Sequence, residues 1–144
     1  MKHPPRVVID TSTLIGAILR PESVPRQVFL LAVGTRKLCV STATLDELRE
    51  VLHRPKFDRY TPLQMRLEFL DLVEQQSLVL QVDLPSEVLA SNACRDAKDT
   101  KFLALALSCK AAALISSDAD LLVLHPWHGI PILTPADFLR SHNA

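Results

Sequence analysis

Short runs rich in β-branched residues alternate with longer stretches of helical spacing along most of this chain. This alternation constrains the fold most, because strand–helix–strand units build a parallel sheet with helices packed on its faces. Pro131 lies inside the last run, and proline cannot donate a ladder hydrogen bond, so we predict that this strand lies at a sheet edge. The chain is therefore predicted to be an α/β protein, three-layered α/β/α, with a central parallel sheet of about five strands. The predicted strands are residues 6–10, 38–41, 78–82, 113–116 and 130–133.

The segments between these strands have the spacing of amphipathic helices. In the segment 42–54, Leu45, Leu48 and Leu52 recur at the spacing of one buried helix face. Thr61 and Pro62 are typical of a helix start, a capping hydroxyl followed by proline at the first helical position. In the helix that follows, the predicted apolar residues are Leu63, Leu67, Leu70 and Val73. Helices are predicted at residues 11–19, 25–34, 42–54, 62–76, 97–110 and 118–124, and from residue 135 onward.

Length and charge narrow the class of protein. The 144 residues suit one compact domain, which we place at 1–144. Sixteen basic and 16 acidic side chains give no net charge, so binding to nucleic acid would need a local basic patch. The three cysteines have neither disulfide-framework nor zinc-site spacing. The sequence shows neither a signal-peptide pattern nor a membrane span, so we expect a cytoplasmic protein with no membrane partner.

Five acidic residues fall where this layout brings strand ends together. Asp10 directly follows the first strand, and Asp118 follows the fourth after two serines. Glu47 lies early in the helix after the second strand, while Asp96 and Asp99 begin the helix before the fourth strand. Ligands of open α/β sheets bind outside the carboxyl ends of the strands, so we expect these acids to meet at one sheet edge. Gathered carboxylates repel one another unless a cation is present, and hard oxygen ligands suit Mg²⁺ or Mn²⁺.

Each acid also has a purely structural interpretation. Asp96 and Asp118 can be helix caps, and Glu47 can be a solvated helix acid or complete a capping box with Thr44. Asp10 is harder to explain in this way, because it ends a strand that should be buried on both faces. Taken together at one sheet edge, the acids favour a metal site.

At these acids the sequence resembles the PIN-domain family, over a match that runs from Arg6 nearly to the C-terminus. Residues 7–12 (VVIDTS) resemble the family's first strand, followed by an Asp and small hydroxyl residues. Residues 42–48 (TATLDEL) resemble the helix that supplies the family's acidic Glu. Residues 99–106 (DTKFLALA) are similar to its third block, an Asp ahead of an alanine-rich helix. Residues 114–121 (LISSDADL) are similar to its fourth, a strand, a hydroxyl and a closely spaced Asp pair.

Three further segments are similar to the toxin components of bacterial toxin–antitoxin systems within this family: residues 54–57 (RPKF), 95–99 (RDAKD) and 132–139 (ILTPADFL). Leu121 is a departure, since many family members carry an aromatic residue there, and it affects packing more than chemistry. The resemblance implies a PIN-like fold and an endoribonuclease that cleaves single-stranded or structured RNA. It also implies a cognate antitoxin protein as partner and is compatible with a homodimer.

The resemblance assigns roles residue by residue. Asp10, Glu47, Asp99 and Asp118 would be the catalytic acids that bind one or two Mg²⁺ or Mn²⁺ ions. Such ions lower the pKa of a bound water and stabilise the charge that develops on the phosphate. Ser116 would orient the site by hydrogen bonding. The other second-tier positions are Ser12, Asp96 and Asp120. Apart from the resemblance, the neutral net charge means that phosphate binding needs a local source of positive charge, and the predicted RNA-binding residues are Arg54, Lys56, Arg59 and Lys101.

Other acidic α/β proteins fit this chain less well. A phosphate-accepting receiver domain carries an acidic pair after its first strand and a lysine after its last, where this chain has only Asp10 and then Thr134 and Pro135. A phosphatase of the haloacid-dehalogenase type needs a second Asp two residues after the first, but position 12 is Ser. The alternative that stays open is a catalytically silent PIN-fold module that binds protein or RNA.

Overall fold

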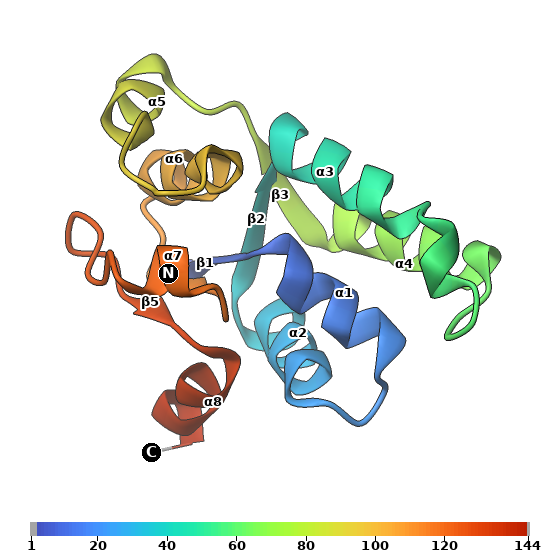
Figure 1. Cartoon of the computed structure of the whole chain (residues 1–144). Helices are drawn as coiled ribbons and strands as arrows, with labels where there is room; N and C mark the ends of the chain where they lie inside the picture. Colours follow the sequence, from blue (N-terminus) through green and yellow to red (C-terminus); the bar gives the residue numbers. More distant parts are fainter. Residues whose placement is uncertain (1–2, 144) are drawn as a thin grey trace.

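The structure is a computed structural model that describes residues 3–143, and its centre is a five-stranded sheet (Figure 1). The strand order is β3-β2-β1-β4-β5, and all neighbouring strands are parallel. The prediction of about five parallel strands is confirmed, and the strand next to Pro131 does lie at the sheet edge. The strands are β1 (Arg6–Ile9), β2 (Lys37–Ser41), β3 (Ser77–Leu80), β4 (Ala113–Ile115) and β5 (Ile132–Leu133).

Helices cover both faces of the sheet, so the predicted three-layer architecture is also confirmed (Figure 1). Two short 3-10 turns, η1 (Pro55–Phe57) and η2 (Ala97–Asp99), lie in the connections. One face is covered by α1 (Thr11–Leu19), α2 (Val24–Thr35), α3 (Thr42–Leu52), α4 (Leu63–Gln76) and α8 (Pro135–Asn143). The other is covered by α5 (Leu84–Ala90), α6 (Thr100–Cys109) and α7 (Ala119–Leu122).

The central strand β1 shows why the sheet needs two helical layers. Successive side chains of a strand point to opposite faces. Val7 and Ile9 pack into the core on the side of α1 and α2, and Val8 packs into the core on the side of α6. All three are almost completely buried, so β1 has apolar residues on both faces, as expected for a central parallel strand.

Some helix and strand boundaries differ from the sequence-based prediction. Helix α5 was not predicted, because its short sequence shows no apolar stripe typical of a buried helix face. In the structure its residues Leu84, Val88 and Leu89 are exposed. Its start has a local signal nonetheless, since the Asp83 side chain accepts a hydrogen bond from the Ser86 amide at 2.8 Å. Strand β3 begins one residue earlier than predicted and ends at Leu80, and the predicted helix at residues 118–124 is only one turn long.

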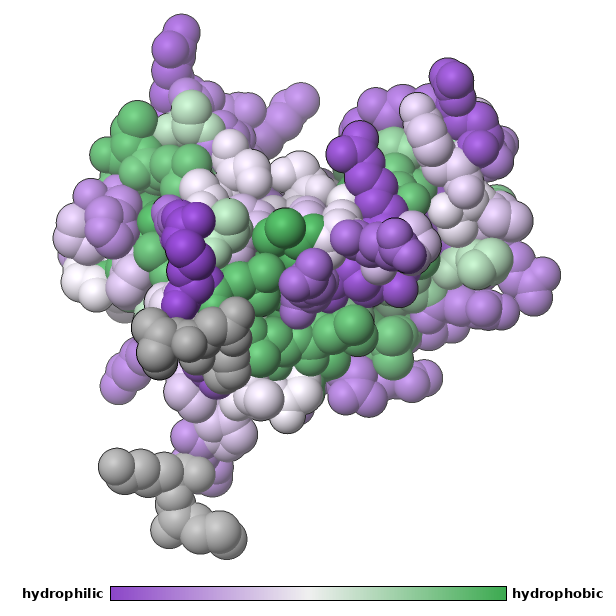
Figure 2. Space-filling view, turned by 90° about the horizontal axis from the view of Figure 1, so that it is seen from below, coloured by the Kyte–Doolittle hydropathy of each residue, from purple (hydrophilic) through white to green (hydrophobic). Residues whose placement is uncertain are grey.

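The described surface mixes polar and apolar residues. Seen from below, hydrophobic residues form a band across the middle of the molecule, with hydrophilic residues around it (Figure 2). Exposed apolar residues are ordinary on folded proteins and by themselves identify no site. No helix formed by residues 3–143 combines the length and the apolar character needed to cross a membrane. The three cysteines are free thiols buried in the interior.

Candidate functional site

The predicted acidic edge forms a cleft at the carboxyl ends of the strands. Strands β1 and β4 are neighbours, and the Asp10 amide donates to the Ile115 carbonyl at 3.0 Å, so the segments after both strands start side by side. Helix α3 follows β2 and supplies Glu47, while η2 supplies Asp99 just before α6. The cleft has a volume of about 330 Å³, and all four predicted metal-binding acids line it. The structure therefore brings Asp10, Glu47, Asp99 and Asp118 to one sheet edge as expected, and their metal-binding role stays a prediction.

Asp10 is a buried carboxylate held in a fixed orientation. Only 4% of the residue is exposed. Oxygen Oδ1 accepts from the Thr13 amide at 3.0 Å and caps α1, and Oδ2 accepts from the Ser116 hydroxyl at 2.5 Å. Burial raises the pKa of Asp10, while the hydrogen bonds from Ser116 and Thr13 act in the opposite direction. The Ser12 hydroxyl adds a longer contact to Oδ1 at 3.4 Å.

Ser116 links the ends of the two central strands. Besides donating to Asp10, its hydroxyl accepts from the Asp118 amide at 2.9 Å. Asp118 is the N-cap of α7, and its Oδ1 accepts from the Asp120 amide at 2.9 Å. The orienting role predicted for Ser116 therefore has a geometric basis, because one hydroxyl connects the Asp10 carboxylate to the backbone of Asp118.

Asp99 and Asp118 place two carboxylates against each other. The pKa of Asp99 is raised to about 7, first by burial and then by the adjoining Asp118 carboxylate, whose negative charge disfavours ionisation of Asp99. Within residues 3–143, the buried oxygen Oδ2 of Asp99 has no hydrogen-bond donor. A buried acceptor without a donor, close to a second carboxylate, is costly unless a proton or a cation is bound there.

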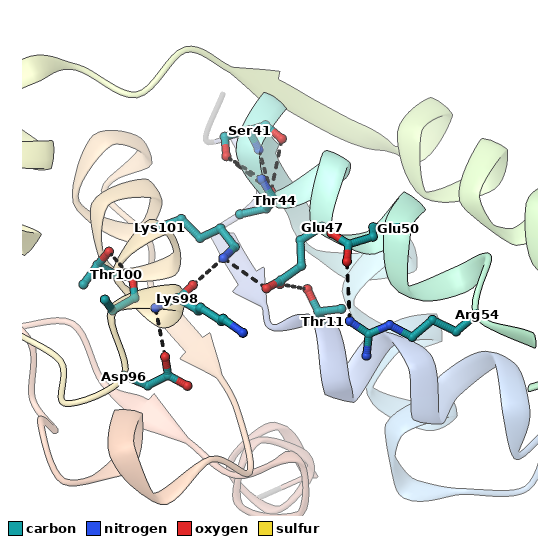
Figure 3. A network of polar contacts seen from close by, with 11 residues as sticks. Thr11, Ser41, Thr44, Glu47, Glu50, Arg54, Asp96, Lys98, Thr100 and Lys101 are labelled. Carbon is teal, nitrogen blue, oxygen red and sulfur yellow. Dashed lines mark hydrogen bonds and ion pairs between the residues drawn. The ribbon is translucent and has the colours of Figure 1, made fainter. Parts of the chain in front are cut away.

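Glu47, in contrast, already has a cation beside it (Figure 3). Its Oε1 is 3.0 Å from the Lys101 ammonium, and its Oε2 accepts a short hydrogen bond from the Thr11 hydroxyl. As the side chains stand, no three His, Cys, Asp or Glu residues of the described chain have their ligand atoms gathered around one point where a metal ion could be held.

The donor set nonetheless fits a divalent cation. It consists of carboxylate oxygens from four separate segments of the chain, and Asp99 Oδ2 is available as a ligand. Such oxygen donors suit Mg²⁺ or Mn²⁺, and a cation would remove the repulsion between Asp99 and Asp118. The second-tier acids are placed less centrally. Asp96 is exposed and caps η2 by accepting from the Lys98 amide at 3.0 Å, and neither it nor Asp120 lines the cleft.

The predicted RNA-binding residues are distributed unevenly around the cleft. Arg54 and Lys56 line it, and Lys101 reaches it through Glu47. Arg59 is exposed outside the cleft lining, with its guanidinium 5.3 Å from the centre of the Tyr60 ring. The basic side chains at this cleft therefore belong to the η1 segment and to α6.

Arg66 was not predicted from the sequence, yet it anchors the segment that carries Arg54 and Lys56. It is fully buried, and its guanidinium donates to the carbonyl oxygens of Leu52 at 2.8 Å and Thr61 at 2.7 Å and to Asp58 Oδ1 at 2.9 Å. Leu63, expected on the apolar face of α4, is exposed instead, and that prediction was wrong. The spacing of Arg66 with Leu70 and Val73 was the available signal, but an arginine is rarely assigned to a buried face.

Comparison with known proteins adds an independent line of evidence. A family model described as PIN domain matches residues 6–120. Uncharacterized protein MJ1680 from Methanocaldococcus jannaschii is 30% identical over 120 residues, which are 83% of this chain and 74% of that protein.

Two solved structures have a similar fold. VapBC2 from Rickettsia felis, bound to a DNA fragment from their promoter, has a TM-score of 0.65 at 10% identity, covering 90% of this chain and 98% of that one. Mycobacterium tuberculosis VapC20, a Sarcin-Ricin loop cleaving toxin, has a TM-score of 0.56 at 12% identity, covering 87% and 98%. At such identities the likeness concerns the fold alone.

Proposed function

The chain belongs to the PIN-domain family, and from this premise we propose that it is a metal-dependent endoribonuclease, the toxin of a toxin–antitoxin pair. Members of this family are generally nucleases. The observation that carries the proposal is the cleft that Asp10, Glu47, Asp99 and Asp118 line together, in which Asp99 and Asp118 are neighbouring carboxylates. Such a pair is unfavourable without a cation and favourable with one.

In this proposal Asp10, Glu47, Asp99 and Asp118 hold Mg²⁺ or Mn²⁺. When bound, the ion supplies a water of lowered pKa and offsets charge on the scissile phosphate. Groups of the chain itself hold the ligands in orientation. The Thr13 amide and Ser116 hydroxyl keep Asp10 from rotating, and the Asp120 amide does the same for Asp118. Fixed ligands need little reorganisation when the ion and the substrate arrive.

The first prediction is metal-dependent cleavage of RNA. The purified protein, freed of metal, is expected to leave a labelled single-stranded RNA intact in EDTA and to cleave it when Mn²⁺ or Mg²⁺ is in excess. The control variant is Asp46→Asn, which removes an exposed acid next to Glu47 that pairs with Arg49 and does not line the cleft. It is expected to cleave at the wild-type rate. Full activity in EDTA would exclude the metal mechanism, and RNA that is bound but never cleaved would identify a silent binding module.

The second prediction concerns how RNA is held. Each RNA phosphate neutralised by a basic side chain releases counter-ions. The plot of log affinity against log salt concentration should therefore have a negative slope, of about 0.7 for each phosphate contact on single-stranded RNA. Lys56→Met is expected to reduce this slope by about 0.7 in EDTA, because Lys56 lines the cleft. Lys37→Met is the control, since Lys37 begins β2 at the opposite end of the sheet. Equal slopes for wild type and Lys56→Met would remove Lys56 from the RNA path.

The same comparisons support a protein partner. VapC20 is described as a toxin, and VapBC2 was crystallised on DNA from its promoter. We propose that a cognate antitoxin binds this chain. We also propose that the chain cleaves RNA in the cytoplasm when it is free of the antitoxin, and that it can form a homodimer. Co-expression with the product of a small neighbouring gene, followed by co-purification, tests the antitoxin directly. If the chain purifies without the co-expressed protein, and its RNA cleavage is the same with and without that protein, this part of the proposal is contradicted.

A further inference from the structure

The strongest unexplained contact at the cleft is the ion pair between Lys101 and Glu47. Lys101 lies in the first turn of α6, two residues after Asp99, and its side chain crosses to Glu47 on α3 (Figure 3). The ammonium lies 3.0 Å from Glu47 Oε1, and it also donates to the Lys98 carbonyl. Both side chains are largely shielded from solvent, with 22% of Lys101 and 24% of Glu47 exposed. Shielding makes such a pair stronger than one on the open surface.

This ion pair keeps Glu47 from acting as a free ligand. The Thr11 hydroxyl donates to Oε2, so both oxygens of Glu47 are engaged at once. A divalent ion coordinated by Glu47 would need one of these oxygens. It would also place two positive charges close to the ammonium, and like charges at such separations repel. The ammonium and the metal ion therefore compete for the same carboxylate.

The other cations of the cleft do not have this relation to the acids. Arg54 pairs with Glu50 at 3.6 Å, and both of these side chains are exposed. Lys56 lies over the Phe57 ring, 5.1 Å from its centre. Among the described residues, Lys101 is the cation that forms a salt bridge with one of the four acids lining the cleft.

Space for a displaced lysine is present next to the ion pair. Lys101 lines a neighbouring hollow of about 250 Å³, whose other lining residues include Ser41, Ala43, Glu87 and Ala104. An ammonium that leaves Glu47 is expected to turn toward this hollow or toward a phosphate in the cleft. Displacement therefore requires only side-chain rotation, which is a fast motion.

We propose that Lys101 is the internal counter-ion of Glu47 in the metal-free protein and that a divalent metal must displace it. The proposal rests on the metal site proposed above. It implies that metal binding frees a positive charge for the substrate, so that the metal-free protein holds RNA more weakly than the loaded one. Lys101 is then a residue that sets metal affinity by competition, not a ligand and not a simple structural lysine.

The test is calorimetric titration of Mn²⁺ into metal-free protein. Lys101→Met removes the competing charge and keeps the aliphatic stem, so Mn²⁺ is expected to bind about fivefold more tightly than to wild type, the size of one partly shielded ion pair. Lys98→Met is the matched control, because it removes a neighbouring charge that makes no salt bridge within residues 3–143, and less than about a twofold change is expected. Lys101→Arg keeps the charge and should bind Mn²⁺ like wild type.

Two further measurements separate competition from a structural role. The melting temperature in EDTA should fall for Lys101→Met, because Glu47 then lacks its partner, and Mn²⁺ should raise it by more than in wild type. In a Glu47→Gln background, Lys101→Met should no longer change Mn²⁺ affinity, since the competed carboxylate is gone.

The outcomes that would overturn the inference are distinct from those that would overturn the function. If Lys101→Met binds Mn²⁺ no more tightly than Lys98→Met, the ammonium does not compete. If it binds more weakly, Lys101 positions Glu47 for the metal instead. Both results leave the proposed nuclease intact, because wild-type protein still binds Mn²⁺. A wild-type protein with no Mn²⁺ binding would exclude the metal site and this inference together.

Discussion

Replacing Asp99 with Asn is expected to abolish metal-dependent RNA cleavage without unfolding the protein. The amide is a much weaker ligand than the carboxylate for a hard cation. The fold should tolerate the change because Asp99 makes no capping hydrogen bond to α6. Cleavage rates in Mn²⁺ and thermal melts in EDTA measure the two effects separately.

The pH dependence of the melt gives this prediction a second readout. The pKa of Asp99 is raised from 3.8 to about 7 in the metal-free fold, so the protonated form is the one that folding favours. The stability contributed by protonated Asp99 is fully present below about pH 4 and is lost as the pH rises through about 7. The Asn variant does not titrate, so relative to wild type it should gain stability over this interval and keep the advantage at pH 8.

Asp96→Ala is the matched comparison, three residues earlier in the same segment. Asp96 is exposed and caps η2, so its loss is expected to lower the free energy of unfolding by about 1 kcal/mol and to leave appreciable activity. A stably folded but inactive Asp96→Ala protein, together with an active Asp99→Asn protein, would reverse the two assignments.

Replacing Arg66 with Met is expected to have the largest effect on stability. The guanidinium is fully buried and is the donor to the carbonyl oxygens of Leu52 and Thr61. Methionine fills part of the volume but leaves both acceptors without this donor, and a buried unsatisfied group costs about 1–3 kcal/mol. We expect a loss of about 3 kcal/mol in urea unfolding, with faster proteolysis between residues 54 and 61.

The effect should also reach the cleft, because Arg54 and Lys56 lie in the segment that Arg66 anchors. RNA affinity in EDTA is therefore expected to fall in Arg66→Met. Gln64→Leu is the control: it changes an exposed residue of the same helix, whose hydrogen bond to Glu68 is long at 3.4 Å, and should alter stability by less than about 0.5 kcal/mol. If Arg66→Met unfolds at the wild-type urea concentration, the anchoring role is wrong.

Much of this protein could be predicted from local sequence patterns. The alternation of strand and helix patterns was enough for the parallel sheet and its three layers, because side-chain periodicity and backbone hydrogen bonding depend on residues close in sequence. The four acids could be assigned to one edge for a related reason. Parallel strands end at a common edge, so a residue that follows a strand is placed by the topology alone. This is why Asp10 and Asp118 were located before any distance was known.

Other features depended on how distant segments pack. Helix α5 has exposed apolar residues and no stripe, so the sequence contained little to mark it apart from the cap at Asp83. Asp99 acquires its raised pKa from burial in the folded protein and from the charge of Asp118, which lies nineteen positions later in the sequence. Burial and charge proximity are properties of the assembled structure, and no spacing rule for one helix contains them.

Arg66 and Lys101 show most clearly which features depend on tertiary packing and could not be predicted from the sequence. In the sequence both are ordinary charged residues on amphipathic helices, for which solvent exposure is the usual expectation. In the folded protein Arg66 is enclosed by the carbonyl groups of two other segments, and Lys101 reaches Glu47 on another helix. The sequence alone determined the class of fold and the acids of the cleft, since both follow from local periodicity and strand order. Only the tertiary structure decided which cations neutralise buried oxygens, because that depends on distances between elements that the chain brings together only on folding.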